Sequence, residues 1–476
     1  MSAVAKLVPA DAIAEIKSVL GPKGWSEDAG DLAPHLIDQR ELYRGRTPLL
    51  ARPATVGELS ALMRVCHRHR IPVVPQGGNT GMVGGGVPHE HGGELLVSTA
   101  RLNRIRALDP LNYTMTAEAG CILANLQKAA EDADRLFPLS LAAEGSCTIG
   151  GNLATNAGGV AVLRYGNTRD LVLGIEVVLA DGRVLESLNA LRKDNTGYDL
   201  KHLFIGSEGT LGFITAAVLK LFPRPRETVT CFVAVPSVAA AVELLALARA
   251  GSGDQLSAFE EMPRLALDLV LEHVPGNIDP LAKRYAIYVL IEFASADAEG
   301  GLKARVEALL ADALERGLVL DATVAASAAQ AQALWRIRES IPEAQKRDGG
   351  GIKHDVSVPI SRMAEFVTAA SAACEARLPG IRVLSFGHVG DGNAHFNLCR
   401  PVGMEKQAFE ARWDEFNRIV HDIVVAMGGS ISAEHGIGRL KREEFAHYAG
   451  AVELDLMRAI KKAIDPLGLM NPGKVL

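Results

Sequence analysis

The sequence predicts an α+β protein made of two dissimilar parts, and three observations support this prediction. Residues 50–225 alternate short apolar runs such as RIPVVPQ, GELLVST and TMTAEAG with glycine-rich turns. From residue 227, strand-like runs such as CFVAVPS and YAIYVLIEF alternate with helix-like runs, an order typical of helices on an antiparallel sheet. The run FPRPR at 222–226 marks a boundary between the two parts. We therefore expect domains over 1–225 and 226–425, followed by a C-terminal segment over 426–476.

Individual elements follow from local patterns along the chain. The N-terminal run MSAVAKLVPADAIAEIKSVLG predicts an amphipathic helix capped near Asp11, and its charged residues argue against a signal peptide. GIEVVLADGRVLES predicts a hairpin with Asp181 and Gly182 at its turn. SVAAAVELLALARA, GLKARVEALLADALERG and AASAAQAQALWRIRESI predict helices, and helices dominate residues 405–465.

Composition excludes several classes of protein. The chain has 476 residues, of which 48% are hydrophobic and 22% charged, so it is long and apolar enough to bury a large core. A net charge of -6 and 5% aromatic residues argue against nucleic acid or anionic lipid as partners. No stretch is apolar enough for a transmembrane helix. The six widely scattered cysteines indicate free, buried thiols, so we expect a cytoplasmic protein.

Glycines make up 47 of the 476 residues and gather in three clusters. The first, VVPQGGNTGMVGGGVP, directly follows a predicted strand, where consecutive backbone N–H groups can converge on a phosphate. It is neither a P-loop nor a GxGxxG motif, and a flexible hairpin is the alternative interpretation. The other clusters are residues 142–159 and 204–215. Three such clusters in one domain favour one extended ligand with the shape of a dinucleotide.

A different motif, RVLSFGHVGDGNAHFNL, occupies residues 382–398. Its turn residues predict a hairpin that brings His388 near His395, with Asn397 on the face of His395. Two imidazoles across a tight turn suit Zn²⁺ or a similar ion, although a pair of structural histidines is the alternative. In SISAEHGIGRLKRE, the adjacent Glu434 and His435 suggest a third metal ligand beside a general base, or else an ordinary exposed pair.

The three glycine motifs, PQGGNTG, EGSCTIGGNLATNAGG and GSEGTLGFIT, resemble in order and spacing the FAD domain of the vanillyl-alcohol oxidase superfamily. The resemblance extends over nearly the whole chain and is strongest to the branch of FAD-binding D-2-hydroxyacid dehydrogenases. It implies a PCMH-type FAD domain of two α+β subdomains, an α+β cap domain with an antiparallel sheet over 226–425, and a C-terminal segment that returns to the FAD domain. It also implies non-covalent FAD, because Asn79 stands where some members have a tethering His.

The matching positions imply a set of site residues. Those expected to bind FAD are Pro75, Gln76, Gly77, Gly78, Asn79, Thr80, Gly81, Met82, Gly145, Ser146, Thr148, Gly151, Asn152, Thr155, Asn156, Gly159, Glu208, Gly209, Ile214 and Asn471. Those expected to bind a divalent metal, zinc first, are His388, His395 and Glu434. Those expected to act on the substrate are His435 as the base, Arg338 and Lys353 as cations, and Asn397 as a contact.

One position departs from the resembled pattern. Members specific for 2-hydroxyglutarate have Thr four residues after the matching Arg, and this chain has Pro342 there. The substrate therefore stays open among 2-hydroxyglutarate, lactate and other D-2-hydroxyacids. The resemblance implies a flavin dehydrogenase that passes electrons to an electron-transfer flavoprotein, a quinone or a cytochrome, and it suggests a homodimer.

Three other functions remain as alternatives. One is a flavin oxidase that uses O₂, and another is a silent flavoprotein subunit of a larger complex. The third is a metal hydrolase, which has no use for the glycine clusters and lacks HExxH here. The pairs His67 and His69, and His89 and His91, are interpreted as surface residues. In NPGKVL at the C-terminus, Asn471 is expected near the flavin ring, or else in a fraying tail.

Overall fold

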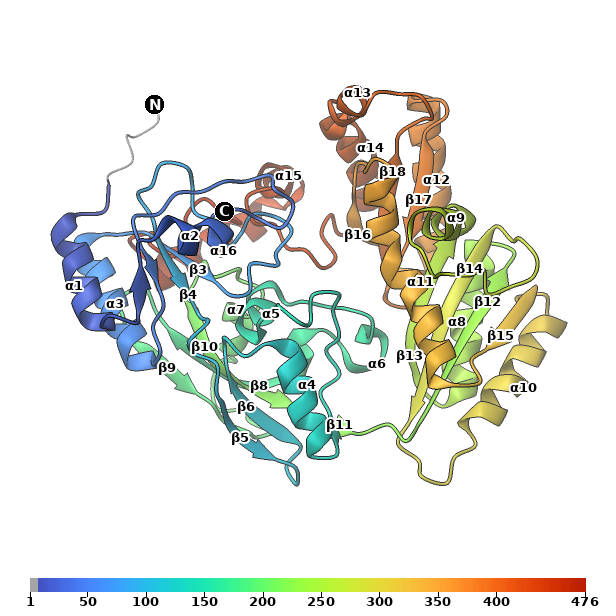
Figure 1. Ribbon diagram of the computed structural model, residues 1–476, viewed down its shortest axis with the longest axis horizontal. Coiled ribbons are helices and arrows are strands. Elements are labelled where there is room, and N and C mark those ends of the chain that lie inside the picture. The colour runs from blue at the N-terminus through green and yellow to red at the C-terminus, as the bar shows by residue number, and fades with distance from the viewer. Residues whose placement is uncertain (1–6) are drawn as a thin grey trace. The chain divides into compact units, whose positions relative to one another are not determined.

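The computed structural model describes residues 7–476, which fold into two compact units. Unit 1 comprises residues 1–159, 166–224 and 434–476, and unit 2 comprises residues 160–165 and 225–433. The chain thus leaves unit 1 twice, once for six residues and once for the whole of 225–433. Figure 1 shows the course of the chain through both units.

Unit 1 contains two main sheets. A four-stranded sheet has the order β1-β2-β4-β3 and is parallel except for β1. A five-stranded antiparallel sheet has the order β5-β6-β10-β8-β9, and β7 pairs with β11. The strands are β1 (Trp25–Ser26), β2 (Leu50–Ala51), β3 (Val73–Gln76), β4 (Leu95–Ser98), β5 (Ile105–Asp109), β6 (Thr114–Glu118), β7 (Arg135–Leu136), β8 (Val172–Val178), β9 (Val184–Ser187), β10 (Phe213–Lys220) and β11 (Phe222–Pro223).

Helices α1 and α3 supply most of the apolar side chains that cover the parallel strands of unit 1. Leu59, Leu62 and Met63 of α3 pack with Ile16 of α1 in a core that also includes Val97 of β4. The helices of this unit are α1 (Ala10–Leu20), α2 (Ala29–Leu32), η1 (Ala33–His35), α3 (Val56–His69), α4 (Leu123–Asp132), α5 (Ile149–Thr155), η2 (Thr168–Leu171), α7 (Lys201–Phe204), α15 (Arg442–Tyr448) and α16 (Ala451–Ile464).

Unit 2 contains a four-stranded antiparallel sheet of order β13-β14-β12-β15 and a three-stranded antiparallel sheet of order β16-β18-β17. The strands are β12 (Glu227–Val235), β13 (Leu256–Pro263), β14 (Ile287–Ser295), β15 (Asp321–Val324), β16 (Asp355–Ser357), β17 (Arg382–Phe386) and β18 (Asn393–Cys399). The helices are α6 (Val162–Tyr165), α8 (Val238–Ser252), α9 (Arg264–His273), α10 (Leu302–Glu315), α11 (Ala328–Arg347), η3 (Ile360–Arg362), α12 (Met363–Arg377), η4 (Val389–Asp391), α13 (Lys406–Glu410) and α14 (Trp413–Ala426).

The larger sheet of unit 2 is apolar on both faces. One face contributes residues such as Val233 and Val289 to a core that includes Leu244 of α8 and Val306 of α10. The other face meets α9 and α11, where Leu290 packs in a separate core with Ile337. Strands buried on both faces read as continuous apolar runs, which is how CFVAVPS and YAIYVLIEF stand out in the sequence.

Several local predictions can be compared directly with the structure. The hairpin around Asp181 and Gly182 forms, because β8 pairs antiparallel with β9 and Gly182 adopts a φ of 84°. The first helix begins at Ala10: its N-cap is Pro9, two residues before the expected Asp11, which lies in its first turn. All six cysteines are free and buried. Across residues 7–476, no helix combines the length and apolar character needed to cross a membrane.

Candidate active site

The three glycine clusters lie against one another in unit 1. A Cβ on Gly77 would approach Thr148 Oγ1 to 2.4 Å, and one on Gly78 would approach the Ser146 carbonyl oxygen to 2.1 Å, so glycine is required where the first loop meets the second. The third cluster joins them, because Gly209, with a φ of +73°, faces the ring of Pro75. Three segments far apart in sequence therefore form one continuous backbone surface.

A cavity of about 530 Å³ opens beside this surface. Its lining includes Gly77, Gly78, Asn79, Ser146 and Thr148. The Thr148 hydroxyl is buried and has no hydrogen-bond partner among the described residues. A buried polar atom without a partner is costly, so this hydroxyl is fitted for a ligand that supplies one. A glycine-lined cavity with an unsatisfied hydroxyl fits the phosphates of the expected FAD.

Only part of the expected FAD set lines this cavity. Gln76 instead donates from Nε2 to the carbonyls of His35 and Gly86, and Asn79 donates from Nδ2 to those of Pro34 and Ile37, so both brace the first loop. The expected residues that do not line it are Pro75, Gln76, Thr80, Gly81, Met82, Gly145, Gly151, Asn152, Thr155, Asn156, Gly159, Glu208, Gly209, Ile214 and Asn471. Lining residues that sequence reasoning missed are Pro34, His35, Ser98, Ala100, Asn103, Ile105, Gly120, Cys121, Ile122, Asn125 and Leu126. Gly120 ends the predicted strand run TMTAEAG and Cys121 follows it, a position that could have suggested both residues.

The C-terminal tail reaches the same region of unit 1. Asn471 is buried, with a φ of 43°, and its Nδ2 donates to the Gly85 carbonyl at 3.0 Å and to the Glu208 carbonyl at 2.8 Å. Its Oδ1 is buried and unpartnered among the described residues, so it too can accept a hydrogen bond from a ligand. The tail is therefore an ordered part of this region and not a fraying end.

Glu208, in the third cluster, secures the segment that follows residue 433. Its carboxylate accepts from the backbone N–H groups of Ile437 and Gly438 at 2.7 and 2.8 Å. Burial raises the pKa of this carboxyl group, and the two N–H donors oppose that rise. Glu434 accepts from the Gly159 N–H at 2.9 Å, so this segment contacts two of the glycine clusters within unit 1.

In unit 2, the small sheet presents the expected substrate residues on one face. Phe386 of β17 pairs with His395 of β18, and His395 also pairs with Asp355 of β16. Because alternate residues of a strand share a face, Asn397 lies on the side of His395. Ile352 bridges Leu398, and this register places Lys353 across from Asn397. The turn predicted from Gly390-Asp391-Gly392-Asn393 forms, and η4 occupies it.

Arg338 lies on α11 and is held by two contacts. Its Nε donates to Glu260 Oε2 at 2.7 Å, and its guanidinium carbon lies 4.9 Å from the ring centroid of Phe386. Arg338 is only 8% exposed, so it is not one of the solvent-exposed helical arginines that form surface ion pairs alone. Arg336, by contrast, is exposed and bonds to Asn277 and Gly276. Two turns further along α11, Gln345 accepts from Asn397 Nδ2 at 2.9 Å.

The two hairpin histidines lie together as the sequence predicted. The rings of His388 and His395 meet edge to face with centroids 5.6 Å apart, and His388 Nδ1 lies 2.5 Å from Glu260 Oε1. If Nδ1–H donates to this carboxylate, Nε2 is the nitrogen able to bind a metal. Two such imidazoles fit a zinc-type ion. The N–H of Ala433 donates to the Asp355 carbonyl at 3.3 Å, so the residue preceding Glu434 lies beside the strand partner of His395.

Glu260 is a site residue that sequence reasoning missed. It is 1% exposed in β13 and bonds to both Arg338 and His388. Burial alone would raise its pKa, but the charges of His388 and Arg338 hold that pKa at about 2. Two adjacent glutamates inside the apolar strand SAFEEMP were the available signal, because a buried carboxylate needs a partner.

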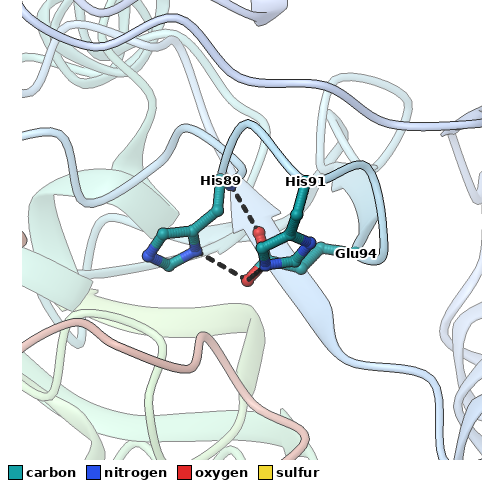
Figure 2. Close-up of side chains that lie close together, drawn as sticks. All are labelled: His89, His91 and Glu94. Carbon is teal, nitrogen blue, oxygen red and sulfur yellow. Dashed lines mark hydrogen bonds and ion pairs between the residues drawn. The ribbon is translucent and has the colours of Figure 1, made fainter. Parts of the chain in front are cut away.

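A second cluster of metal-type ligands, His89, His91 and Glu94, lies in unit 1 (Figure 2). Their ligand atoms lie within 4.8 Å of one another, and His89 Nδ1 is 2.8 Å from Glu94 Oε1. The ammonium of Lys474, fully enclosed at 2% residue exposure, already lies 3.9 Å from Glu94 Oε2 and 3.4 Å from His89 Nδ1. A divalent cation would have to share the Glu94 carboxylate with that ammonium. We therefore interpret the cluster as an ion-pair network that holds Lys474 of the C-terminal tail, and not as a metal site.

The expectation that both histidine pairs lie at the surface is therefore wrong for His89, which is half-buried in this network, while His91 is exposed. The other pair, His67 and His69, lies in the last turn of α3, where His69 is 3.5 Å from Glu15.

Comparisons with known proteins agree with this arrangement. Residues 47–187 match the family model described as FAD binding domain, and residues 224–475 match that of FAD linked oxidases, C-terminal domain. A relative from Oryza sativa subsp. indica, named probable D-2-hydroxyglutarate dehydrogenase, mitochondrial, is 40% identical over 98% of this chain and 82% of its own length. D-2-hydroxyglutarate dehydrogenase of Xanthomonas citri pv. viticola is 41% identical over 92% of this chain and 91% of its own length.

Solved structures show the same fold at low sequence identity. An alkyldihydroxyacetonephosphate synthase matches 99% of this chain and 87% of its own with a TM-score of 0.73 at 18% identity. The p-cresol methylhydroxylase with substrate bound matches 98% of this chain and 96% of its own with a TM-score of 0.73 at 16% identity. The expected α+β fold of the vanillyl-alcohol oxidase type is thus confirmed. With both family models matched and whole-chain relatives near 40% identity, the chain belongs to the FAD linked oxidases, in a branch whose curated members include proteins named D-2-hydroxyglutarate dehydrogenases.

Proposed function

We propose that this protein is an FAD-dependent dehydrogenase that oxidises a D-2-hydroxyacid of the 2-hydroxyglutarate type to the corresponding 2-oxoacid. The observation that carries the proposal is the gathering of Arg338, Lys353, Asn397, His388 and His395 around one face of the small sheet of unit 2. The names of the relatives from Oryza sativa and Xanthomonas citri support the substrate class.

The substrate residues have distinct roles in this proposal. Arg338 and Lys353 are the two cations of this set, and each can bind a carboxylate group of a dicarboxylate substrate. The bond from Asn397 to Gln345 fixes the amide plane of Asn397, so its carbonyl oxygen is oriented to accept from the substrate. Pro342 stands where 2-hydroxyglutarate-specific members have Thr and offers no hydroxyl to a second carboxylate, so D-lactate-type substrates are the competing class.

The chemistry requires a base, a Lewis acid and a hydride acceptor. His435 would take the proton of the 2-hydroxyl, because histidine is the side chain that most often acts as a general base in proteins. A divalent cation held by His388, His395 and Glu434 would supply Lewis acidity next to that hydroxyl. FAD would supply the acceptor for the hydride from C2. Thr148 and Asn471 offer the polar atoms, and Gly77 and Gly78 the close backbone approach, that its binding calls for.

The flavin in this proposal is FAD, held without a covalent bond. Asn79 cannot form the histidyl link, and its Nδ2 is engaged with Pro34 and Ile37. After acid precipitation, all of the yellow chromophore should stay in the supernatant. Flavin that remains on the precipitated chain would contradict non-covalent binding, and colourless protein that binds no added FAD would contradict the whole proposal.

The decisive experiment is a dye-reduction screen of the purified, FAD-loaded protein over the D and L forms of 2-hydroxyglutarate, lactate and malate. We expect the highest kcat/KM for D-2-hydroxyglutarate and at least a hundredfold lower value for the L form. A higher kcat/KM for D-lactate would contradict the proposed substrate but agree with the proposed reaction, the FAD-dependent oxidation of a D-2-hydroxyacid. No dye reduction with any hydroxyacid, together with no O₂ consumption, would leave the silent-subunit alternative.

The remaining features of the proposal concern the setting of the enzyme. We propose an electron-transfer flavoprotein, a quinone or a cytochrome as acceptor, a homodimer as assembly, and the cytoplasm as compartment. The relatives from plants and animals are named mitochondrial, whereas the name of the Xanthomonas citri relative states no compartment. Fractionation of the source cells and light scattering of the pure protein test the last two.

A further inference from the structure

We infer that Glu260 is a positioning residue that holds the substrate cation Arg338 and the metal ligand His388 with one carboxylate. The inference rests on the proposed function and deepens it. Glu260 Oε2 accepts from Arg338 Nε at 2.7 Å, and Oε1 lies 2.5 Å from His388 Nδ1. All three residues lie in unit 2, and Glu260 comes from β13 of the larger sheet, outside the hairpin and the helix that carry its partners.

The bond to His388 selects a tautomer. One oxygen of Glu260 accepts from Arg338 Nε and the other lies 2.5 Å from His388 Nδ1, so the carboxylate offers that nitrogen only an acceptor and Nδ1 of His388 carries the proton in this pair. The unprotonated nitrogen is then Nε2, and an imidazole binds a metal only through an unprotonated nitrogen. Carboxylates in this position orient metal-binding histidines in other proteins and raise their basicity. Glu260 thus prepares His388 as a ligand before any ion arrives.

The bond to Arg338 orients the guanidinium in the same way. Glu260 engages only Nε, and Phe386 lies 4.9 Å from the guanidinium carbon. One hydrogen bond and one ring face fix the plane of the fork, and Glu260 engages neither of its two terminal nitrogens. Those nitrogens form the edge that binds a carboxylate with two parallel hydrogen bonds. Glu260 also balances a charge that is only 8% exposed.

The two roles depend on one property of a carboxylate, namely two acceptor oxygens. Both partners donate, Arg338 from Nε–H and His388 from Nδ1–H, so a side chain with a single acceptor satisfies only one of them. Glu260→Gln keeps the length and offers one oxygen, and its amide group would face a second donor. Glu260→Asp keeps two acceptors but is one methylene shorter, so it cannot reach both partners in place. The two variants therefore separate charge from reach.

The test measures zinc binding and steady-state kinetics in parallel on FAD-loaded wild type, Glu260→Gln and Glu260→Asp. The matched control is Glu292→Gln, a largely buried carboxylate of the neighbouring strand β14 that accepts from Trp335 and has no arginine or histidine partner. We expect Glu260→Gln to weaken zinc binding by about 10–100-fold and to raise KM for D-2-hydroxyglutarate by at least tenfold. FAD content should stay unchanged, and Glu260→Asp should recover part of the zinc affinity.

Two outcomes separate the inference from the proposed function. Suppose that wild type binds zinc and oxidises the substrate. If the zinc Kd and the substrate KM of Glu260→Gln then lie within twofold of the wild-type values, the inference is overturned and the proposed function stands. If wild type neither binds zinc nor oxidises any hydroxyacid, both fail. If Glu260→Gln does not fold, nitrogen NMR of the zinc-free wild type tests the inference instead, by showing which ring nitrogen of His388 carries the proton. Protonated Nδ1 on His388 supports the inference, and protonated Nε2 overturns it.

Discussion

Two arginines on α11 show how surroundings decide the use of a charged residue. Arg338 is enclosed by Glu260 and Phe386, whereas Arg336, two positions earlier, is exposed and donates to the loop at Gly276 and Asn277. A guanidinium in bulk water gains little from one more ion pair, whereas a desolvated one gains much more. Only Arg338 is therefore suited to hold a substrate carboxylate.

Substitution of these two arginines should separate their roles. Arg338→Lys keeps the charge, so Glu260 retains a partner, but it removes the planar fork. We expect the KM for D-2-hydroxyglutarate to rise at least tenfold and the KM for D-lactate to rise less, as measured by dye reduction. Arg336→Lys is the control and should change both values less than twofold. An equal rise for both substrates would assign Arg338 to the carboxylate that they share.

Glu261, next to Glu260 on β13, behaves differently from its neighbour. Burial raises the pKa of Glu261 to about 8, although the nearby Arg338 lowers it and the charge of Glu260 raises it further. The unfolded chain releases this proton near its ordinary value of 4.5. Between these two pH values the folded state retains a proton that the unfolded state has lost, so the stability of the fold decreases as the pH rises.

Replacing Glu261 with a neutral amide should remove this pH dependence. Glu261→Gln should match wild type near pH 4.5 and exceed its free energy of unfolding by at least about 1 kcal/mol at pH 8.5, since one pKa unit corresponds to about 1.4 kcal/mol. Urea unfolding at pH 5, 7 and 8.5 measures the difference. Glu307→Gln, at a half-exposed site on α10 of the same unit, is the control and should show no such trend. A constant difference at all three values would contradict the argument.

At the scale of elements, α11 contains a proline in its interior. Pro342 lies four residues after Arg338, at the position whose N–H would donate to the Arg338 carbonyl in a regular helix. Proline has no N–H, so this bond is missing directly beside Arg338, the residue proposed to bind the substrate. The helix persists to Arg347 because Leu334, Ile337, Ile341 and Ala344 pack in the core of unit 2.

Restoring the missing N–H should stabilise α11. Pro342→Ala should raise the free energy of unfolding by about 1–3 kcal/mol, since an interior proline costs about 3 kcal/mol and part of that is already relaxed. Pro342→Thr should also lower the KM for D-2-hydroxyglutarate by supplying a hydroxyl. The control is Pro359→Ala at the N-cap of η3, where no helical bond is lost, and it should not stabilise. Stability of Pro342→Ala below that of wild type would show that the proline fits the helix.

Elements that depend on neighbouring residues were predictable from the sequence, and those that depend on distant ones were not. The hairpin of His388 and His395 follows from its turn residues, and the contact among the glycine clusters was expected from their shared composition. Glu260 was missed because its partners are 78 and 128 residues away. The excursion of residues 160–165 into unit 2 was also missed, because Leu163 packs on a core built from residues after 225.

At the scale of the whole chain, the C-terminal tail completes unit 1. Asn471 joins Gly85 of the first cluster to Glu208 of the third, and Lys474 pairs with Glu94, which Figure 2 shows beside His89 and His91. Lys461 adds bonds to the carbonyls of Thr210 and Met470. Segments separated by up to 386 positions thus depend on the last residues of the chain.

The tail should therefore control how tightly FAD is held. Asn471→Gly removes both donated bonds but accepts the φ of 43°, so the loss is not confused with backbone strain. Two hydrogen bonds of about 1 kcal/mol each correspond to at least a tenfold rise in the Kd of FAD, as measured by flavin fluorescence. Asn471→Asp keeps an acceptor at Oδ1 but cannot donate, so it should weaken FAD binding similarly. An FAD Kd within twofold of wild type in Asn471→Gly would show that the glycine loops hold their positions without the tail.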